Sequence, residues 1–210
     1  MIDIEQVKTD KFNFYLFRNI FNDEELELIW RESLFLCDND KLLPPDKTGT
    51  GKREDGTPKK SNVGIQLDNC YSDRTICNYF KFYKKPLDNL ISNTSFIKND
   101  YTLKLYLNTN LDKTLFNYYD DNDYYESHND LSCYTYVFWL LYEPKRFTGG
   151  NFKFDDIDYN IEVKSNMGVL FPSWANHSVE RVNLLSNIQH LKGNGRFSFT
   201  TFFLMKTRTE

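Results

Sequence analysis

Short β-rich runs follow one another through the second half of this 210-residue chain, and they constrain its fold more than any other feature. Turn signals such as Asp120-Asp-Asn-Asp123 and Thr148-Gly-Gly150 separate the runs. The runs are 101–107, 114–118, 124–128, 133–142, 151–154, 160–163, 168–171, 178–182 and 196–205. Many short strands at this spacing predict a β-sandwich or a barrel.

The N-terminal segment begins with a strand pattern that changes into a helix pattern. Phe12, Phe14 and Leu16 alternate with other residues, as in a half-buried strand. Asn22 then offers an N-cap oxygen, and Glu25 follows three residues later, as in a capping box. The apolar positions that come next repeat with a helical period, so we expect a helix over about 23–34.

A second helix is predicted over 72–90, with a kink or break at Pro86. Helices first and strands later is an α+β order, in which the helices pack outside a β core. We therefore expect an α+β, mainly β chain that forms one domain over 1–210. Helical support would occupy about 1–98, and the β core about 99–206.

Residues 44–62 form the only linker-like stretch, rich in Lys, Gly and Pro and without a large apolar residue. Too little chain precedes them for a separate core, so the stretch is interpreted as a long loop within the domain. Such loops are either lids and binding loops or solvated insertions, and the sequence leaves both alternatives open.

Composition excludes several classes of protein. The aromatic share is 17%, which argues against disorder. The net charge of −4 lacks the positive excess that is typical of proteins that bind nucleic acid. No stretch approaches the roughly 20 apolar residues of a membrane helix, and the N-terminus shows no signal peptide pattern. The four cysteines, at 37, 70, 77 and 133, have no CxxC spacing and are expected as reduced thiols. These features predict a cytoplasmic protein without a membrane association.

Three histidines carry the candidate chemistry. His128 and Asp130 lie two residues apart, so in a strand both side chains point to the same face and can ligate one metal ion. His177, at a turn leading into another strand, would complete a set of two histidines and one carboxylate. That set is diagnostic of non-haem Fe(II) oxygenases. His190 lies in a polar loop, where we expect it to be solvated.

The last predicted strand opens with Arg196. Arg196, Ser198 and Thr200 share one of its faces, while Phe197 and Phe199 share the other. A guanidinium on a face that should be core calls for a buried anionic partner, and a carboxylate suits it best. The alternative is an arginine at a strand end that reaches solvent.

Taken together, these parts resemble the Fe(II)/2-oxoglutarate-dependent dioxygenases, and within them the prolyl 4-hydroxylase-like branch. The matching segments, in the family's order, are 118–130, 138–142, 149–154, 168–173, 177–182 and 195–200. Segments 15–25 and 64–68 also resemble the branch's usual start and the stretch before its second helix. The resemblance implies a double-stranded β-helix, or jelly roll, flanked by N-terminal helices.

Site residues follow from the resemblance position by position. His128, Asp130 and His177 would ligate Fe(II), and Arg196 would pair with the distal carboxylate of 2-oxoglutarate. Three further residues are expected to contact this cosubstrate: Tyr118, Tyr125 and Ser198. The register between the two tyrosines is left open, and the 19-residue gap from His177 to Arg196 is longer than the family's.

The resemblance implies an enzyme that hydroxylates an unactivated C–H bond with Fe(II), 2-oxoglutarate and O2, and ascorbate is a candidate reductant. A prolyl residue of a peptide or protein is the first expected substrate, and a free amino acid or another small molecule is the alternative. Two rival interpretations keep the fold: a non-catalytic jelly-roll binding module, and a cupin-type metalloenzyme that uses no 2-oxoglutarate. Nothing in the sequence indicates a nucleic-acid partner.

Overall fold

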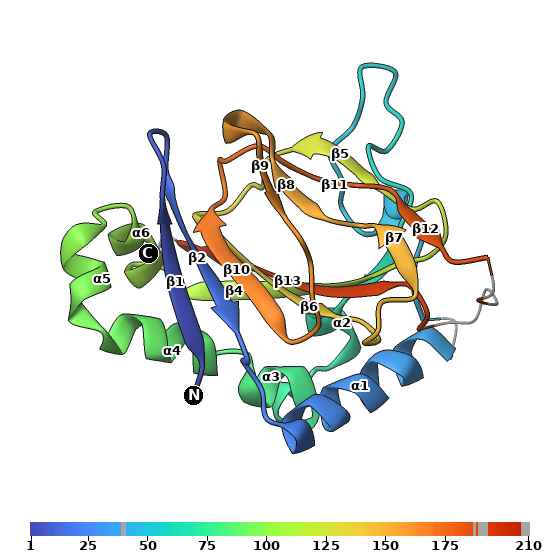
Figure 1. Ribbon diagram of the computed structural model, residues 1–210, viewed down its shortest axis with the longest axis horizontal. Helices are drawn as coiled ribbons and strands as arrows, with labels where there is room; N and C mark the ends of the chain where they lie inside the picture. Colours follow the sequence, from blue (N-terminus) through green and yellow to red (C-terminus); the bar gives the residue numbers. More distant parts are fainter. Residues whose placement is uncertain (39–40, 187, 189–192, 207–210) are drawn as a thin grey trace.

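Two facing β-sheets form the centre of the computed structural model, which describes residues 1–38, 41–186, 188 and 193–206 (Figure 1). The larger sheet is antiparallel, with the strand order β1-β2-β10-β6-β13-β4-β3. Its strands are β1 (Asp3–Lys8), β2 (Asn13–Arg18), β10 (Met167–Pro172), β6 (Tyr134–Leu140), β13 (Arg196–Leu204), β4 (Leu111–Tyr119) and β3 (Val63–Gln66).

The smaller sheet lies over one face of the larger one and has the order β5-β11-β8-β9. Its strands are β5 (Tyr125–His128), β11 (His177–Val179), β8 (Phe152–Phe154) and β9 (Tyr159–Ile161). A separate ladder joins β12 (Val182–Leu184) to β7 (Phe147–Gly149). The mainly β architecture confirms the predicted jelly roll with helices outside it.

Helices cover the other face of the larger sheet, with α1, α3 and α4 beneath it in Figure 1 and α5 and α6 at one end. The helices are α1 (Asp23–Asp38), α2 (Leu67–Cys70), α3 (Asn78–Phe82), α4 (Lys85–Ser92), α5 (Thr94–Asn99) and α6 (Leu103–Leu107). Short 3-10 turns occupy Pro45–Lys47, Arg74–Ile76 and Asp155–Ile157. Within the described residues, no helix combines the length and hydropathy that a membrane span requires.

Strict alternation along the central strands produces two separate cores. In β6, Tyr136 and Phe138 pack toward the helices, whereas Val137 and Trp139 pack between the sheets. In β13 the phenylalanines at 197, 199 and 203 join the helix-side core. The opposite face of β13 is left for Arg196, Ser198 and Thr200, as the sequence predicted.

The predicted capping box begins α1. The Glu25 backbone N–H donates to Asn22 Oδ1 at 2.9 Å, and the Asn22 backbone N–H donates to Glu25 Oε2 at 3.0 Å. The helix runs four residues beyond its predicted end, to Asp38, because Leu36 and Cys37 are buried and extend its packed face.

Two predicted elements are wrong. Segment 101–107, expected as a strand, contains helix α6, because the Asp100 carboxylate accepts from the backbone N–H groups of Thr102 and Leu103 and starts a helical turn there. Segment 72–90 is not one helix but a 3-10 turn followed by α3 and α4. Pro86 lies in the first turn of α4, the helical position that tolerates proline best.

The long loop 44–62 ends in a β-hairpin, which projects beyond β5 in Figure 1. Lys52 pairs with Pro58 across the hairpin, and Lys59 N–H donates to Gly51 O at 2.9 Å. The chain then runs beside β5, where Glu126 N–H donates to Lys59 O at 2.9 Å and Ser61 N–H donates to Tyr124 O at 3.2 Å. The loop is therefore joined to the edge of the smaller sheet.

Candidate metal centre

Three side chains that are distant in sequence converge between the sheets. His128 and His177 are cross-strand partners on β5 and β11, and Asp130 follows β5 directly. The Asp130 carboxylate lies 3.9 Å from His128 Nε2 and 3.7 Å from His177 Nε2. One ligand atom from each residue lies within 4.8 Å of the other two, which is close enough for one metal ion.

Backbone carbonyls orient both imidazoles. His128 Nδ1 lies 2.9 Å from Glu126 O, and His177 Nδ1 lies 2.9 Å from Ala175 O. Because a carbonyl only accepts, each Nδ1 carries a proton, and in the neutral ring that binds a metal ion the Nε2 lone pair would then point toward Asp130. Burial, followed by the neighbouring His177, holds the pKa of His128 well below its ordinary value, so the ring is the neutral ligand form.

The Asp130 carboxylate is also held in place. The Thr135 hydroxyl donates to Asp130 Oδ2 at 2.6 Å, and the Asp130 backbone N–H donates to Ser173 O at 2.9 Å. Thr135 and Ser173 are themselves buried and hydrogen-bonded to each other. Sequence reasoning missed Thr135, although it lies on β6, the strand that follows the His-x-Asp motif.

The three residues line one side of a cavity of about 600 Å³. Its walls come from β13, β4, β3, β5, β6, β8, β11 and residues Thr48–Gly51 of the long loop. Apolar residues such as Val137, Phe152 and Val179 lie beside the polar groups. The site is therefore a partly apolar pocket with few convergent polar groups, as small-molecule sites commonly are.

Arg196 lies in this cavity and is 1% exposed, so it does not reach solvent as the alternative interpretation required. Its Nη1 donates to Gly150 O at 2.8 Å, and its guanidinium lies 5.0 Å from the Tyr119 ring centre. Nε has no hydrogen-bond partner, and no carboxylate of the described residues pairs with the side chain. Burial lowers the pKa of Arg196 to about 10, which still leaves it charged at neutral pH.

Tyr118, which the sequence predicts to contact the cosubstrate, does not line the cavity. Its hydroxyl accepts from Gly193 N–H at 3.1 Å and from Gly195 N–H at 3.2 Å, on the helix side of β4. Tyr119, one residue later, faces Arg196 and lines the cavity. Arg196 pairs with Tyr119 across the ladder, so the alternation along β4 places Tyr119 on the cavity face once the β4–β13 register is known.

Tyr125 and Ser198 do line the cavity. The Tyr125 ring stacks on His128, with ring centres 3.5 Å apart, and its hydroxyl accepts from Gly51 N–H at 3.1 Å. Ser198 is buried one β-period from Arg196 on the same face of β13. His190 lies outside the described residues.

Comparisons with known proteins agree with this geometry. Residues 114–204 match the family described as the 2OG-Fe(II) oxygenase superfamily, where 2OG is 2-oxoglutarate, and the resemblance found in the sequence is thereby confirmed. The matched region contains His128, Asp130, His177 and Arg196. A comparison with curated protein sequences finds no match.

Solved structures share the fold at low sequence identity. A prolyl-4-hydroxylase from Pseudomonas putida is 14% identical, with a TM-score of 0.58 over 92% of this chain and 93% of that one. A Trichoplax adhaerens prolyl hydroxylase, solved with a peptide fragment of the hypoxia inducible factor oxygen degradation domain, is also 14% identical, with a TM-score of 0.61 over 91% and 83%. A full-length Neurospora crassa protein, solved in complex with alpha-KG, is 13% identical, with a TM-score of 0.50 over 93% and 77%.

The 2OG-Fe(II) oxygenase family uses Fe(II), 2-oxoglutarate and O2, and the donor set of this chain suits these partners. Two neutral imidazoles and one carboxylate are the ligands of non-haem Fe(II) sites, and they leave adjacent coordination positions open. The buried Arg196 guanidinium, with its Nε unpaired, suits a dicarboxylate. Both requirements are met inside one cavity.

Proposed function

We propose that this chain is an Fe(II)- and 2-oxoglutarate-dependent dioxygenase that hydroxylates an unactivated C–H bond, with a prolyl residue of a peptide or protein as the first expected substrate. The observation that carries the proposal is the buried, carboxylate-free Arg196 in the same cavity as His128, Asp130 and His177. A metal-binding module without 2-oxoglutarate would give this guanidinium no anionic partner, and burying a charge without one is costly.

His128, Asp130 and His177 would hold the metal through Nε2, a carboxylate oxygen and Nε2. Glu126 O and Ala175 O keep the two rings in the tautomer that exposes Nε2, and the Thr135 hydroxyl fixes the carboxylate. When bound together, Fe(II), 2-oxoglutarate and O2 supply the oxidation, which converts 2-oxoglutarate to succinate and CO2 and inserts one oxygen atom into the C–H bond.

Arg196 would bind the distal carboxylate of 2-oxoglutarate, with Ser198 beside it on β13. The hydroxyls of Tyr119 and Tyr125, which also line the cavity, are further candidates for cosubstrate contacts. Val137, Phe152 and Val179 add apolar surface to the cavity, and a less polar surrounding strengthens a charge-assisted bond to Arg196.

Support for a peptidyl substrate comes from the fold alone, since two of the similar structures are prolyl hydroxylases and one of these was solved with a peptide. The test incubates the protein with Fe(II), ascorbate, 2-oxoglutarate and proline-containing peptides. Succinate formation and a peptide mass gain of about 16 Da, both absent in His128→Ala, are the expected results.

Other outcomes of that test have distinct meanings. Succinate without a modified peptide would support the oxygenase activity but rule out the prolyl substrate. Free amino acids would then be assayed. No 2-oxoglutarate binding in the presence of Mn(II) would reject the oxygenase and favour a non-catalytic module of the same fold.

A further inference from the structure

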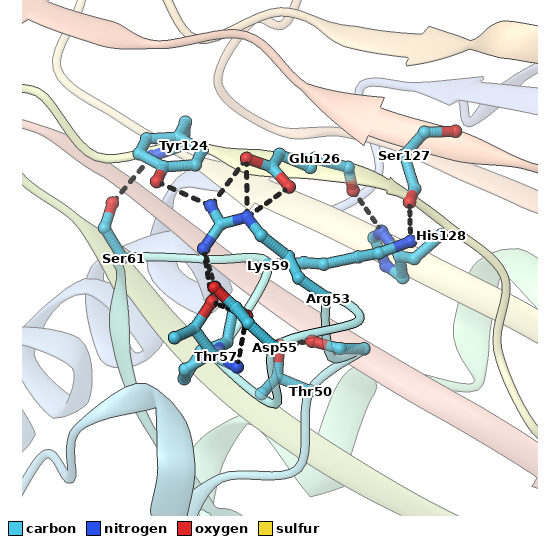
Figure 2. Close-up of polar contacts among 12 residues, drawn as sticks. Thr50, Arg53, Asp55, Thr57, Lys59, Ser61, Tyr124, Glu126, Ser127 and His128 are labelled. Carbon is cyan, nitrogen blue, oxygen red and sulfur yellow. Dashed lines mark hydrogen bonds and ion pairs between the residues drawn. The ribbon is translucent and has the colours of Figure 1, made fainter.

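The guanidinium of Arg53 bridges the hairpin at the end of the long loop to β5. Arg53 Nε lies 3.0 Å from Glu126 Oε2, and Arg53 Nη2 lies 2.6 Å from Glu126 Oε1, which is a two-pronged ion pair. Nη2 also donates to the Tyr124 hydroxyl at 3.1 Å. Figure 2 shows Arg53 between the hairpin and β5, with these contacts on one side.

The remaining Arg53 nitrogen is used within the hairpin itself. Nη1 donates to Pro58 O at 2.9 Å and to Thr57 Oγ1 at 3.0 Å. Asp55 accepts from the backbone and hydroxyl of Thr57, which shapes the turn that Arg53 spans. Most surface ion pairs contribute little to stability, but a bidentate pair within a hydrogen-bond network is the exception.

Glu126 connects this ion pair to the metal centre. Its side chain binds Arg53, its backbone N–H donates to Lys59 O, and its carbonyl accepts from His128 Nδ1 at 2.9 Å. Glu126, whose carbonyl orients a candidate metal ligand, is therefore held by three contacts, and the hairpin supplies two of them.

The hairpin base also touches the site directly. Gly51 N–H donates to the hydroxyl of Tyr125, whose ring stacks on His128. A Cβ at Gly51 would lie 3.5 Å from His128 Cβ, so this backbone passes close beside the ligand residue. Thr48–Gly51 form a wall of the cavity, so a shift of the hairpin changes both the wall and the imidazole.

From these contacts we infer that Arg53 and Glu126 are a positioning pair, which seats the hairpin and thereby fixes the His128 imidazole and the Thr48–Gly51 wall of the cavity. The inference rests on the proposed metal centre. Hydrogen-bond partners of metal-bound histidines typically change metal affinity about 10- to 100-fold when they are lost. Arg53 does not contact His128 itself but binds Glu126, whose carbonyl does. Its loss should therefore lower the metal affinity by an amount near the lower end of that range.

The test measures Co(II) binding and the visible Co(II) spectrum, which reports ligand geometry, in three variants and a control. Arg53→Ala and the nearly isosteric Glu126→Gln should each weaken Co(II) affinity about tenfold and alter the spectrum. Arg53→Lys keeps the charge but loses the two-pronged guanidinium geometry. Its Co(II) affinity should therefore lie between those of Arg53→Ala and the unmodified protein. Arg18→Ala removes the exposed Arg18–Glu5 pair at the far edge of the larger sheet and should change neither measurement.

Hydrogen exchange of the metal-free protein provides a second measurement. In Arg53→Ala, exchange should become faster in 48–61 and in 124–128 together, because the two segments share one network. Unchanged Co(II) affinity and spectrum in both Arg53→Ala and Glu126→Gln would overturn this inference but leave the metal centre intact. If the unmodified protein bound no Co(II), the metal centre would be refuted and the inference with it.

Discussion

His128 and His177 face each other across the β5–β11 ladder, with ring centres 4.2 Å apart and the Asp130 carboxylate within 4 Å of both Nε2 atoms. Each ring is fixed by a carbonyl two residues before it in sequence, at Glu126 and Ala175. The same local device therefore orients both imidazoles, and the pairing of two short strands brings them together. A metal site built this way depends on the ladder as much as on the ligands.

Asp130→Ala should remove metal binding. The two neutral imidazoles alone carry no charge to offset that of a divalent cation, so Mn(II) affinity should fall by more than about 100-fold, beyond the effect of outer-shell partners. Calorimetric titration with Mn(II) measures this. Asp46→Ala, which removes an exposed carboxylate on the long loop, is the matched control. An Asp130→Ala protein that binds Mn(II) like its parent would contradict the assignment.

Arg196→Met should selectively weaken 2-oxoglutarate. A hydrogen bond to a charged group contributes about 1.5–3 kcal/mol, which corresponds to about 10- to 150-fold in affinity. Titration in the presence of Mn(II) gives the dissociation constants. The comparison ligand is 2-oxobutyrate, which has the keto acid but no distal carboxylate. The parent should strongly prefer 2-oxoglutarate, the variant should not, and a preference retained by Arg196→Met would show that Arg196 does not bind that carboxylate.

Tyr119→Phe and Tyr118→Phe should separate binding from stability. Tyr119 lines the cavity beside Arg196, so loss of its hydroxyl should raise the 2-oxoglutarate dissociation constant. Tyr118 accepts two backbone N–H groups on the opposite face, so its loss should lower the free energy of unfolding by about 1–3 kcal/mol and leave 2-oxoglutarate binding unchanged. Denaturant unfolding and cosubstrate titration check both expectations. If Tyr118→Phe weakened 2-oxoglutarate binding and Tyr119→Phe did not, Tyr118 would be the residue that contacts the cosubstrate.

Periodic features were predictable from the sequence. The alternation in β13 placed Arg196 and Ser198 on the face opposite Phe197 and Phe199, and the structure confirms it. The Asn22–Glu25 capping box, a contact over three residues, was also correct. Both signals arise within a few residues of one another, where the backbone geometry alone decides which side chains meet.

Features that depend on distant partners were not predictable. The apolar residues of segment 101–107 alternate as in a strand, but the Asp100 carboxylate caps a helical turn there. The choice between Tyr118 and Tyr119 required the β4–β13 register. The Arg53–Glu126 pair joins residues 73 positions apart, and no local pattern marks Glu126 as its partner.

Lys60 is a second buried cation near the metal centre. It is 3% exposed, its Nζ lies over the Tyr125 ring at 5.5 Å, and it has no hydrogen-bond partner among the described residues. Burial lowers the pKa of Lys60 from 10.5 to about 8, while the charge of Asp130 opposes that change. A base whose folded pKa is depressed destabilises the fold wherever it is charged, below about pH 8, and this cost disappears by pH 10.5, where the unfolded chain has also released its proton.

Lys60→Met should therefore stabilise the metal-free protein at pH 7 by up to about 3 kcal/mol, because the drop in pKa from 10.5 to about 8 converts to that free energy. The gain should shrink as the pH rises from 8 to 10.5, because the parent protein loses its buried charge in that range. Denaturant unfolding of parent and variant at several pH values measures the difference, and Lys47→Met, on an exposed side chain, should show no such trend. A difference between Lys60→Met and the parent that is the same at pH 7 and pH 10.5 would mean that Lys60 is not buried in its charged form, since its ionisation would then be equal in the folded and unfolded chains.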